Sequence, residues 1–419
     1  MTITPDELQA LMDKRATELA PDLVAWRRDF HQHPELSNRE FRTAEIVAKH
    51  LRHLGMDVTT GIAHTGVVGI FRGALPGPVI ALRADMDALP VAEATGLPFA
   101  SHAKAHFEGR EVAVMHACGH DCHTAILMTV ASVLTRFQSS WPGTVKFIFQ
   151  PAEEGPPAGE EGGADLMIRQ GVLENPAPEV IFGLHVFAGM KSGMLGYRPG
   201  PVMASSDTLH ILIRGRQAHG GMPWQGVDPI VVAAQVVLAL QTIPSRQLDV
   251  TREPVILTLG RIQGGLRDNI IPEEVELLGT LRTFDEDMRQ ELAERVRRTA
   301  EKVAESAGAT AQVRIDRGYP VTSNHEILTE SMLPTLQRVA GHDGVFLSRK
   351  ITGAEDFSRY QEKIPGLFIF LGITPDAMDP RQAAPNHSAH FVVDETALPV
   401  GVRALVHLAS DYAFSRSNR

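Results

Sequence analysis

The chain has 419 residues, which at about 150 residues per domain is too long for one hydrophobic core and predicts two or three domains. A hydrophobic content of 43% and a charged content of 21% are typical of a soluble globular protein. The formal net charge of −10 argues against non-specific nucleic-acid binding, which requires a basic face.

The compartment is indicated by the N-terminus and by the cysteines. The first residues are acidic and lack the apolar core of a signal peptide, and no apolar run reaches the roughly 20 residues that a membrane span requires. The chain has only 2 cysteines, which form no disulfide framework and fit a reducing compartment. We therefore expect a cytoplasmic protein that binds neither membranes nor nucleic acid.

Helical patterns alternate with short apolar strands over the first 195 residues. Ser37 and Glu40 have the spacing of a capping box, which predicts a helix that starts there and ends at Gly55. We expect Phe41, Ala44, Val47, Leu51 and Leu54 to face inward on that helix. Further helices are expected over 5–20, 22–33 and 124–137, and strands over 67–71, 79–82, 144–149 and 181–185. This alternation predicts an α/β fold with a mostly parallel sheet between helices.

The pattern changes after about residue 195 and later returns. Strands are expected over 207–214, 255–259 and 275–283, and helices over 228–243 and 286–307, which together make a compact α+β unit. A helix near 325–340, a strand over 366–371 and a helix near 394–415 then continue the first pattern. We therefore predict a discontinuous catalytic domain, residues 1–195 and 316–419, interrupted by a smaller domain, residues 196–315.

Residues 116–123 read His-Ala-Cys-Gly-His-Asp-Cys-His and contain both cysteines. Imidazole, thiolate and carboxylate are the side chains that bind zinc and related ions. Cys118 and His120 lie two residues apart in a glycine-containing loop, so both side chains can face one site. A buried structural cysteine beside a hydrogen-bonded histidine is the alternative interpretation of this pair.

Other side chains that can bind metal follow the apolar strands. Ligands of open α/β sheets bind at the carboxyl ends of the strands, so these side chains are expected to meet there. They are Glu153 and Glu154, His185, and Asp85 and Asp87, which could be ligands or could orient a histidine; His387 lies in an irregular loop late in the chain. One acid of the adjacent pair can bind metal while the other serves as a general base. With Cys118 and His120, five plausible ligands and a free acid suggest two metal ions rather than one.

These residues, in this order, resemble the M20 metallopeptidase family and its amidohydrolase branch. That branch contains hippurate hydrolases, N-acyl-amino-acid amidohydrolases and plant auxin-conjugate hydrolases. The matching segments span nearly the whole chain, at residues 26–36, 83–90, 115–121, 150–154, 183–185, 218–223, 226–229, 269–272, 353–357 and 386–388.

The resemblance implies two divalent ions per subunit, zinc or manganese, with cobalt and nickel as alternatives. It assigns Glu153 as the general base and then the acid, and Asp87 as the support of a metal ligand. The implied metal ligands are Cys118, His120, Glu154, His185 and His387, with Cys118 as the bridge.

The resemblance also gives the smaller domain the role of a lid and dimerisation domain, and the protein the state of a homodimer or dimer-based oligomer. His219 and Asn269 would reach the substrate from this domain, with His219 stabilising the oxyanion within its own subunit or across the dimer. Cys122 stands where many relatives have a small residue, and we expect it to be buried and inert.

We therefore predict a metal-dependent hydrolase that cleaves the amide bond of N-acyl amino acids or related small amides. A metal-bound hydroxide would attack the carbonyl, with Glu153 as general base. The alternatives are an aminopeptidase or carboxypeptidase acting on short peptides, a non-catalytic metal-binding protein, and a cysteine hydrolase that uses Cys118 or Cys122.

Overall fold

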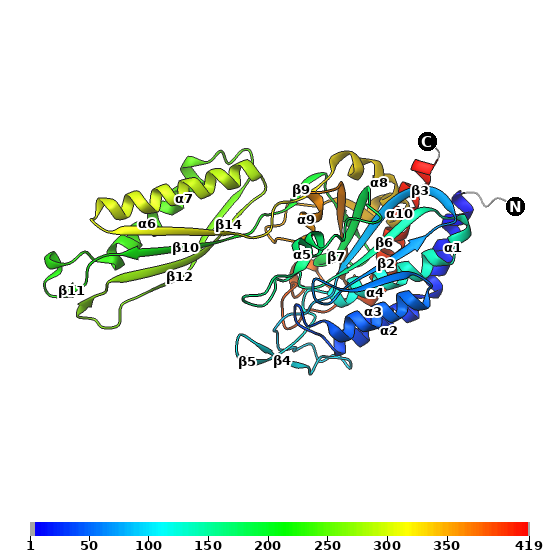
Figure 1. The fold of residues 1–419 in the computed structure, drawn as a ribbon, viewed down its shortest axis with the longest axis horizontal. Helices are drawn as coiled ribbons and strands as arrows, with labels where there is room; N and C mark the ends of the chain where they lie inside the picture. The colour runs from blue at the N-terminus through cyan, green and yellow to red at the C-terminus, as the bar shows by residue number, and fades with distance from the viewer. Residues whose placement is uncertain (1–4, 418–419) are drawn as a thin grey trace. The chain divides into compact units, whose positions relative to one another are not determined.

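The protein is described by a computed structural model that covers residues 5–417 (Figure 1). The chain divides into two compact units. The first unit takes the described residues up to Gly200, together with Asn324–Ser348 and those from Arg359 onward; the second takes Pro201–Ser323 and Arg349–Ser358. The roles of catalytic domain and of lid and dimerisation domain stay predictions.

An eight-stranded sheet forms the centre of the first unit, in the order β1-β2-β6-β3-β7-β18-β8-β17 (Figure 1). Its strands are β1 (Asp57–Ile62), β2 (Gly66–Arg72), β3 (Leu75–Asp85), β6 (Pro142–Gln150), β7 (Val180–Lys191), β8 (Leu195–Tyr197), β17 (Val345–Leu347) and β18 (Gly366–Thr374). The neighbours β6 and β3, β3 and β7, β7 and β18, and β8 and β17 are parallel, and the other pairs are antiparallel. The predicted α/β fold is confirmed, with a mixed sheet in place of a mostly parallel one.

Helices pack against this sheet and against one another. They are α1 (Pro5–Glu18), α2 (Ala20–Gln32), α3 (Phe41–His53), α4 (His120–Thr135), α5 (Gly163–Arg169), α8 (Glu326–Ala340) and α10 (Leu398–Ser417), and the short α9 (Phe357–Gln361) crosses the boundary between the units. Helix α4 is buried along almost its whole length, since α2 and α10 pack on it and β3 and β7 lie beneath it. It begins four residues before the predicted start at 124, so His120 lies in its first turn and not in a loop.

The expected capping box at Ser37 and Glu40 does not form. Glu40 is itself the N-cap of α3 and its side chain does not cap the helix; the Glu35 carboxylate accepts from the Arg42 and Thr43 amides of the first turn instead. The Ser37 hydroxyl instead donates to Asp87, and the Glu40 carboxylate accepts from the Ala152 amide. Phe41, expected to face inward, is 63% exposed, whereas Val47 and Leu51 are buried as predicted. Tertiary partners have therefore displaced the local capping interaction.

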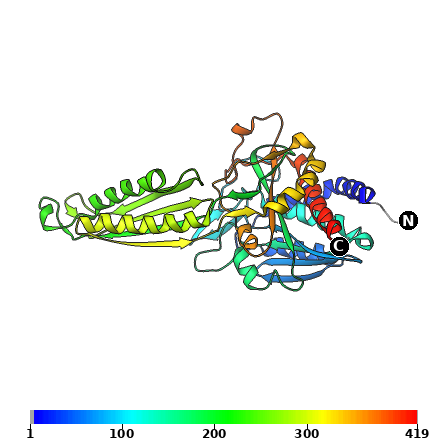
Figure 2. The same cartoon turned by 90° about the horizontal axis from the view of Figure 1, so that it is seen from above.

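The second unit is built on an antiparallel sheet in the order β12-β14-β10-β15, with two helices on one face (Figure 2). The strands are β10 (Asp207–Arg214), β12 (Val255–Gly264), β14 (Glu274–Thr283) and β15 (Thr310–Arg317), and the helices are α6 (Pro229–Thr242) and α7 (Glu286–Ser306). Smaller pairs are β9 (Gly200–Met203) with β16 (Thr322–Asn324), β11 (Ala218–His219) with β13 (Ile270–Ile271) and, in the first unit, β4 (Lys104–Phe107) with β5 (Arg110–Ala113).

Helix α6 corrects one statement made from the sequence. Within residues 5–417, the helical stretch Pro229–Gln247 is long and apolar enough to cross a membrane by length and composition alone. The core helix of a soluble protein passes the same test, and here α6 packs on α7 and on the sheet.

A buried ion pair joins α7 to β10 in the second unit. The Arg289 guanidinium donates to both oxygens of Asp207, at 2.9 and 2.6 Å, and the two side chains are only 6% and 1% exposed. The Gly318 amide and Arg317 also donate to Asp207. Removing this carboxylate would leave a guanidinium that is largely excluded from water.

We therefore expect Asp207→Ala to lower the free energy of unfolding by about 2 kcal/mol, because the Arg289 guanidinium then keeps only the exposed Glu286 as a charged partner. The matched control is Glu291→Ala, which removes the more exposed partner of Arg295 on the same helix and should cost about 0.5 kcal/mol or less. Urea unfolding followed by circular dichroism measures both. Equal losses in the two variants would contradict the assignment.

Candidate metal centre

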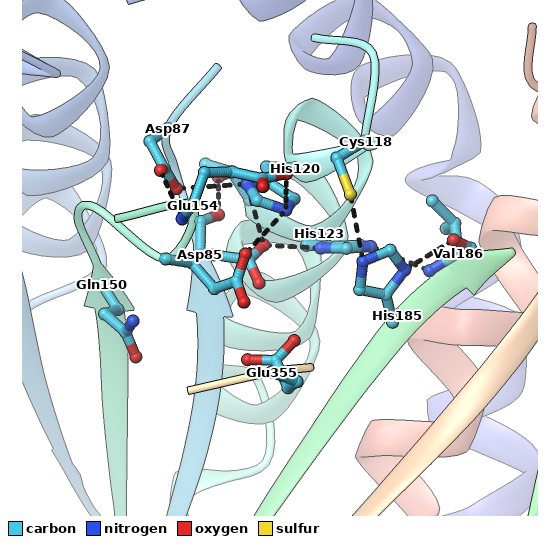
Figure 3. Close-up of polar contacts among 12 residues, drawn as sticks. Asp85, Asp87, Cys118, His120, His123, Gln150, Glu154, His185, Val186 and Glu355 are labelled. Atoms are coloured by element: carbon cyan, nitrogen blue, oxygen red, sulfur yellow. Dashed lines mark hydrogen bonds and ion pairs between the residues drawn. The ribbon is translucent and has the colours of Figure 1, made fainter. Parts of the chain in front are cut away.

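The polar side chains that follow β3, β6 and β7 come together at one edge of the sheet (Figure 3). Asp85 is the last residue of β3, Glu153 and Glu154 follow β6, and His185 lies within β7. These three strands are neighbours and run parallel, so their carboxyl ends lie side by side. The start of α4 brings His120 to the same edge, with its ring next to Asp87.

Cys118 lies at the middle of the cluster. Its Sγ is 3.4 Å from His185 Nε2 and 3.3 Å from His387 Nε2. Glu154 Oε1 is 3.1 Å from the same nitrogen of His387. Several groups of possible ligand atoms result, each with its atoms within 4.8 Å of one another, and two of them contain Cys118: Cys118, His120 and His185 in one, and Cys118, Glu154 and His387 in the other. The five side chains that the family resemblance selected therefore converge.

The ring of His120 is held on one side only. Its Nδ1 lies 3.2 Å from Asp87 Oδ1, whereas its Nε2 is buried and has no hydrogen-bond partner within residues 5–417. Burial lowers the pKa of His120, but the carboxylates of Asp85 and Asp87 outweigh it and raise this pKa to about 10. A histidine oriented by a carboxylate on one nitrogen, with the other directed into a polar cluster, has the geometry of a metal ligand.

His185 is oriented in the same way. Its Nδ1 donates to the Val186 carbonyl at 2.6 Å, which leaves Nε2 facing Cys118. His123 differs, because both of its nitrogens are used: one lies 2.5 Å from Asp85, and Nε2 accepts from the Val186 amide at 2.8 Å. His123 therefore supports the strand end beside His185 and is not available as a ligand.

The local charge fits a divalent cation. Burial raises the pKa of the Cys118 thiol well above its usual range, and the carboxylates of Glu154 and Glu153 raise it further. A divalent ion placed among these atoms would favour the thiolate and offset the carboxylate charge. The Cys118 thiol, the Glu154 carboxylate and the imidazole nitrogens that face them thus form a donor set suited to zinc or manganese.

The turn that carries Glu153 and Glu154 is held by Glu40 and Asp87. From the sequence, Glu40 was expected to cap a helix. Ala152 has a φ of +53°, which only a tertiary constraint stabilises in a non-glycine residue. Its amide donates to Glu40, and the Glu154 amide donates to Asp87 at 3.0 Å. Burial and the nearby Asp87 raise the pKa of Glu40 to about 8. The spacing of Ser37 and Glu40 predicted a helix cap, so the sequence did not show that Glu40 holds this turn.

A second buried network anchors the first turn of α4. Asp121 forms an ion pair with Arg27, with Oδ2 3.0 Å from Nε, and the same oxygen lies 2.8 Å from His31 Nδ1. Burial opposes ionisation of Asp121, but Arg27 and His31 lower its pKa far below the usual range. Both partners come from α2, in the motif that includes His31, for which the sequence alone gave no role. Cys122 is fully buried there, and burial raises its thiol pKa, as expected for an inert cysteine.

His219 and Asn269 belong to the second unit. His219 lies in β11 beside Ile270, its Nδ1 accepts from the Gly221 amide, and the Asn269 carbonyl accepts from Gly220. His219 and Asn269 are exposed. The two residues therefore lie close together: His219 is on β11, and Asn269 directly precedes β13, the strand that pairs with it.

The model of peptidase family M20/M25/M40 matches residues 81–411. "Thermostable carboxypeptidase 1" of Saccharolobus solfataricus is 38% identical over 95% of this chain and 96% of its own length. "N-acetyl-L-cysteine deacetylase" of Bacillus subtilis is 39% identical over 91% of this chain and 85% of its own. The crystal structure of the Bacillus subtilis YXEP protein, described as a dinuclear metal-binding peptidase from the M20 family, superposes with a TM-score of 0.79, at 34% identity over 95% of this chain and 99% of that chain.

These matches cover both units of the chain and the whole set of strand-end motifs. They confirm the family predicted from the motifs, its α/β fold and a metal-dependent amidohydrolase. The chain belongs to peptidase family M20/M25/M40.

Proposed function

We propose that this enzyme hydrolyses the amide bond of N-acyl amino acids or related small amides. The observation that carries the proposal is the convergence of five metal-binding side chains on one edge of the sheet, with Glu153 beside them. Glu153 Oε2 lies 3.8 Å from His120 Nε2, and its side chain is only 7% exposed. The N-acetyl-L-cysteine deacetylase relative supports an N-acyl amino acid as substrate.

The proposed ligands are Cys118, His120, Glu154, His185 and His387. Cys118 Sγ lies between His185 Nε2 and His387 Nε2, which supports it as the residue shared by two ions, zinc or manganese. When bound, the ions would supply Lewis acidity that polarises the scissile carbonyl and makes water more acidic. Asp87 contributes by holding the His120 ring at Nδ1, so that Nε2 stays directed into the site.

Glu153 carries protons in this proposal. Its carboxylate takes a proton from the attacking water and later gives it to the amine that leaves. Two features restrict the Glu153 carboxylate to one position. The side chain is buried, and the preceding residue, Ala152, donates its amide to Glu40. A rigid, partly desolvated base of this kind suits a reaction in which the same group first accepts and then donates a proton.

We expect Glu153→Ala to keep its metal and to lose at least about 100-fold in kcat, the usual contribution of a general base. Glu161→Ala is the control, because Glu161 lies in the same loop with its side chain 68% exposed, and kcat should change little. Steady-state kinetics and elemental analysis of both purified variants measure the effect. Near wild-type turnover by Glu153→Ala would remove Glu153 from the mechanism.

Removal of metal provides a second test. Elemental analysis should find about two divalent ions per chain, and chelation should abolish hydrolysis and lower the melting temperature, because ions that bind only the folded state stabilise it. Added zinc or manganese should restore both. Full activity in the presence of a chelator would instead favour a thiol nucleophile, Cys118 or Cys122.

We further propose that the second unit is a lid and dimerisation domain. Strand β12 is at the edge of its sheet, and α6 exposes apolar side chains beside it, with Val231 54% and Leu238 72% exposed. An open strand edge next to an apolar helix surface is a suitable interface for a second copy of the chain. His219 and Asn269, exposed on the same unit, would bind the substrate, with His219 donating to the oxyanion.

We expect His219→Ala to lower kcat by about 10-fold to 1,000-fold while the metal content stays unchanged, since loss of one oxyanion donor has that effect. Mixing this variant with Glu153→Ala should restore activity if His219 acts across a dimer, and should restore none if it acts within its own subunit. Loss of metal from His219→Ala would contradict the assignment and make His219 a metal ligand.

A carboxypeptidase is the second candidate, and the 38% identity to a thermostable carboxypeptidase supports it. The chemistry at the metal centre would be the same, and the substrates would differ in the free amine. Comparing benzoyl-glycine with a dipeptide that has a free amine, on enzyme of known metal content, separates the two candidates.

A further inference from the structure

A cavity of ≈ 800 Å³ opens beside Glu154 in the first unit. The β4–β5 hairpin forms one wall, the loop over residues 154–158 another, and the segment over residues 88–90 after β3 a third. Most of the lining is apolar, and Leu36, Leu89, Phe107, Pro156 and Pro157 contribute to it. A cavity of this size and character is typical of a site for a small organic group.

The cavity is connected to the metal centre through Glu154. This residue lines the cavity and also has its Oε1 3.1 Å from His387 Nε2 in the ligand cluster. Ala88 and Leu89, on another wall, directly follow Asp87, which holds His120. A substrate whose scissile bond lies at the cluster can therefore extend one of its two halves into the cavity.

The charges along the cavity decide which half fits. Two acids, Glu108 and Glu154, line it. The Arg39 guanidinium, which also lines it, is paired with Glu160 through two nitrogens, at 3.1 and 2.5 Å. Glu154 is a proposed metal ligand, so the half of the substrate that carries the amino-acid carboxylate would meet Glu108, and Arg39 could compensate its charge only by leaving Glu160. An uncharged hydrocarbon group meets the leucine, proline and phenylalanine side chains without that cost.

We propose that this cavity binds the hydrocarbon part of the acyl group, so that the enzyme prefers N-acyl amino acids with long acyl chains over N-acetyl amino acids. This assignment rests on the proposed hydrolysis of N-acyl amino acids, and it adds which acyl groups the enzyme prefers. Burial of each additional methylene should then raise kcat/KM by roughly fourfold until the cavity is filled.

The test uses a series of N-acyl glycines, acetyl, hexanoyl and decanoyl, in which only the acyl chain changes. Ala105→Trp on β4 and Ala158→Trp on the adjoining loop fill the cavity from two walls. Lys104→Trp is the matched control, because successive residues of a strand point to opposite faces and the Lys104 side chain is 65% exposed. Melting temperatures and metal content establish that each variant is folded and loaded.

For the wild type, kcat/KM should rise by at least about 1,000-fold from acetyl-glycine to decanoyl-glycine, a rise that five of the eight added methylenes would supply at roughly fourfold each. Ala105→Trp and Ala158→Trp should each reduce the ratio between these two substrates by about tenfold, and Lys104→Trp should retain the wild-type ratio. A wild-type ratio near one, or a ratio that survives both filling substitutions, would overturn the assignment.

Calorimetric binding separates this inference from the reaction itself. Decanoyl-glycine and acetyl-glycine are titrated into the metal-free wild type and into both filled variants. If no acyl glycine is hydrolysed, the proposed reaction fails. Tighter binding of decanoyl-glycine that both filled variants lose would still support the cavity assignment, whereas equal binding of the two compounds would overturn it.

Discussion

The two oxygens of Asp87 hold together segments that lie far apart in the sequence. Oδ1 faces His120 at the start of α4, and Oδ2 accepts from the Ser37 hydroxyl and from the Glu154 amide. The carboxylate is fully buried, so each of these contacts is made in a medium that screens charge poorly. One side chain thereby orients an imidazole and fixes the turn that carries both glutamates. The rest of the site depends on that arrangement.

Buried acids in the first unit fall into two kinds. Asp121 is paired with Arg27 and His31, and this pairing fixes the first turn of α4 against α2. Around Cys118 the nearest nitrogens belong instead to His185 and His387. No arginine or lysine pairs with Glu154 among the contacts described around Cys118, where the nearby bases are histidines. The structural acid therefore has a permanent cation as its partner, whereas the acids at the sheet edge lie among side chains that can bind metal.

The same edge of the sheet joins chemistry to substrate selection. Glu154 belongs to the ligand cluster and to the wall of the apolar cavity, so the backbone turn after β6 positions both. That turn is held by Glu40 through Ala152, in a backbone conformation that a non-glycine residue adopts only under constraint. A change at Glu40 would therefore reach the proposed general base Glu153, the proposed metal ligand Glu154 and the cavity together.

The order of elements and a set of candidate metal-binding side chains followed from the sequence. Apolar strands and helical periodicity are local patterns, and they predicted β10, β14 and α7 near their observed positions. The family resemblance selected the five proposed ligands, and the structure brings those side chains together. The resemblance to a known family added the assignments of Glu153, Asp87 and His219, because no spacing rule distinguishes one glutamate of an adjacent pair from the other.

Only the tertiary structure showed which locally predicted interactions do not form. Ser37 and Glu40 read as a helix cap, but buried amides and a carboxylate from other segments offer them stronger partners than the helix end does. The mixed sheet, the role of His31 and the cavity beside Glu154 likewise depend on contacts between residues distant in the chain. The sequence by itself determined which groups could bind metal, since that is a property of each side chain; the fold decided where they meet, since that depends on which segments become neighbours.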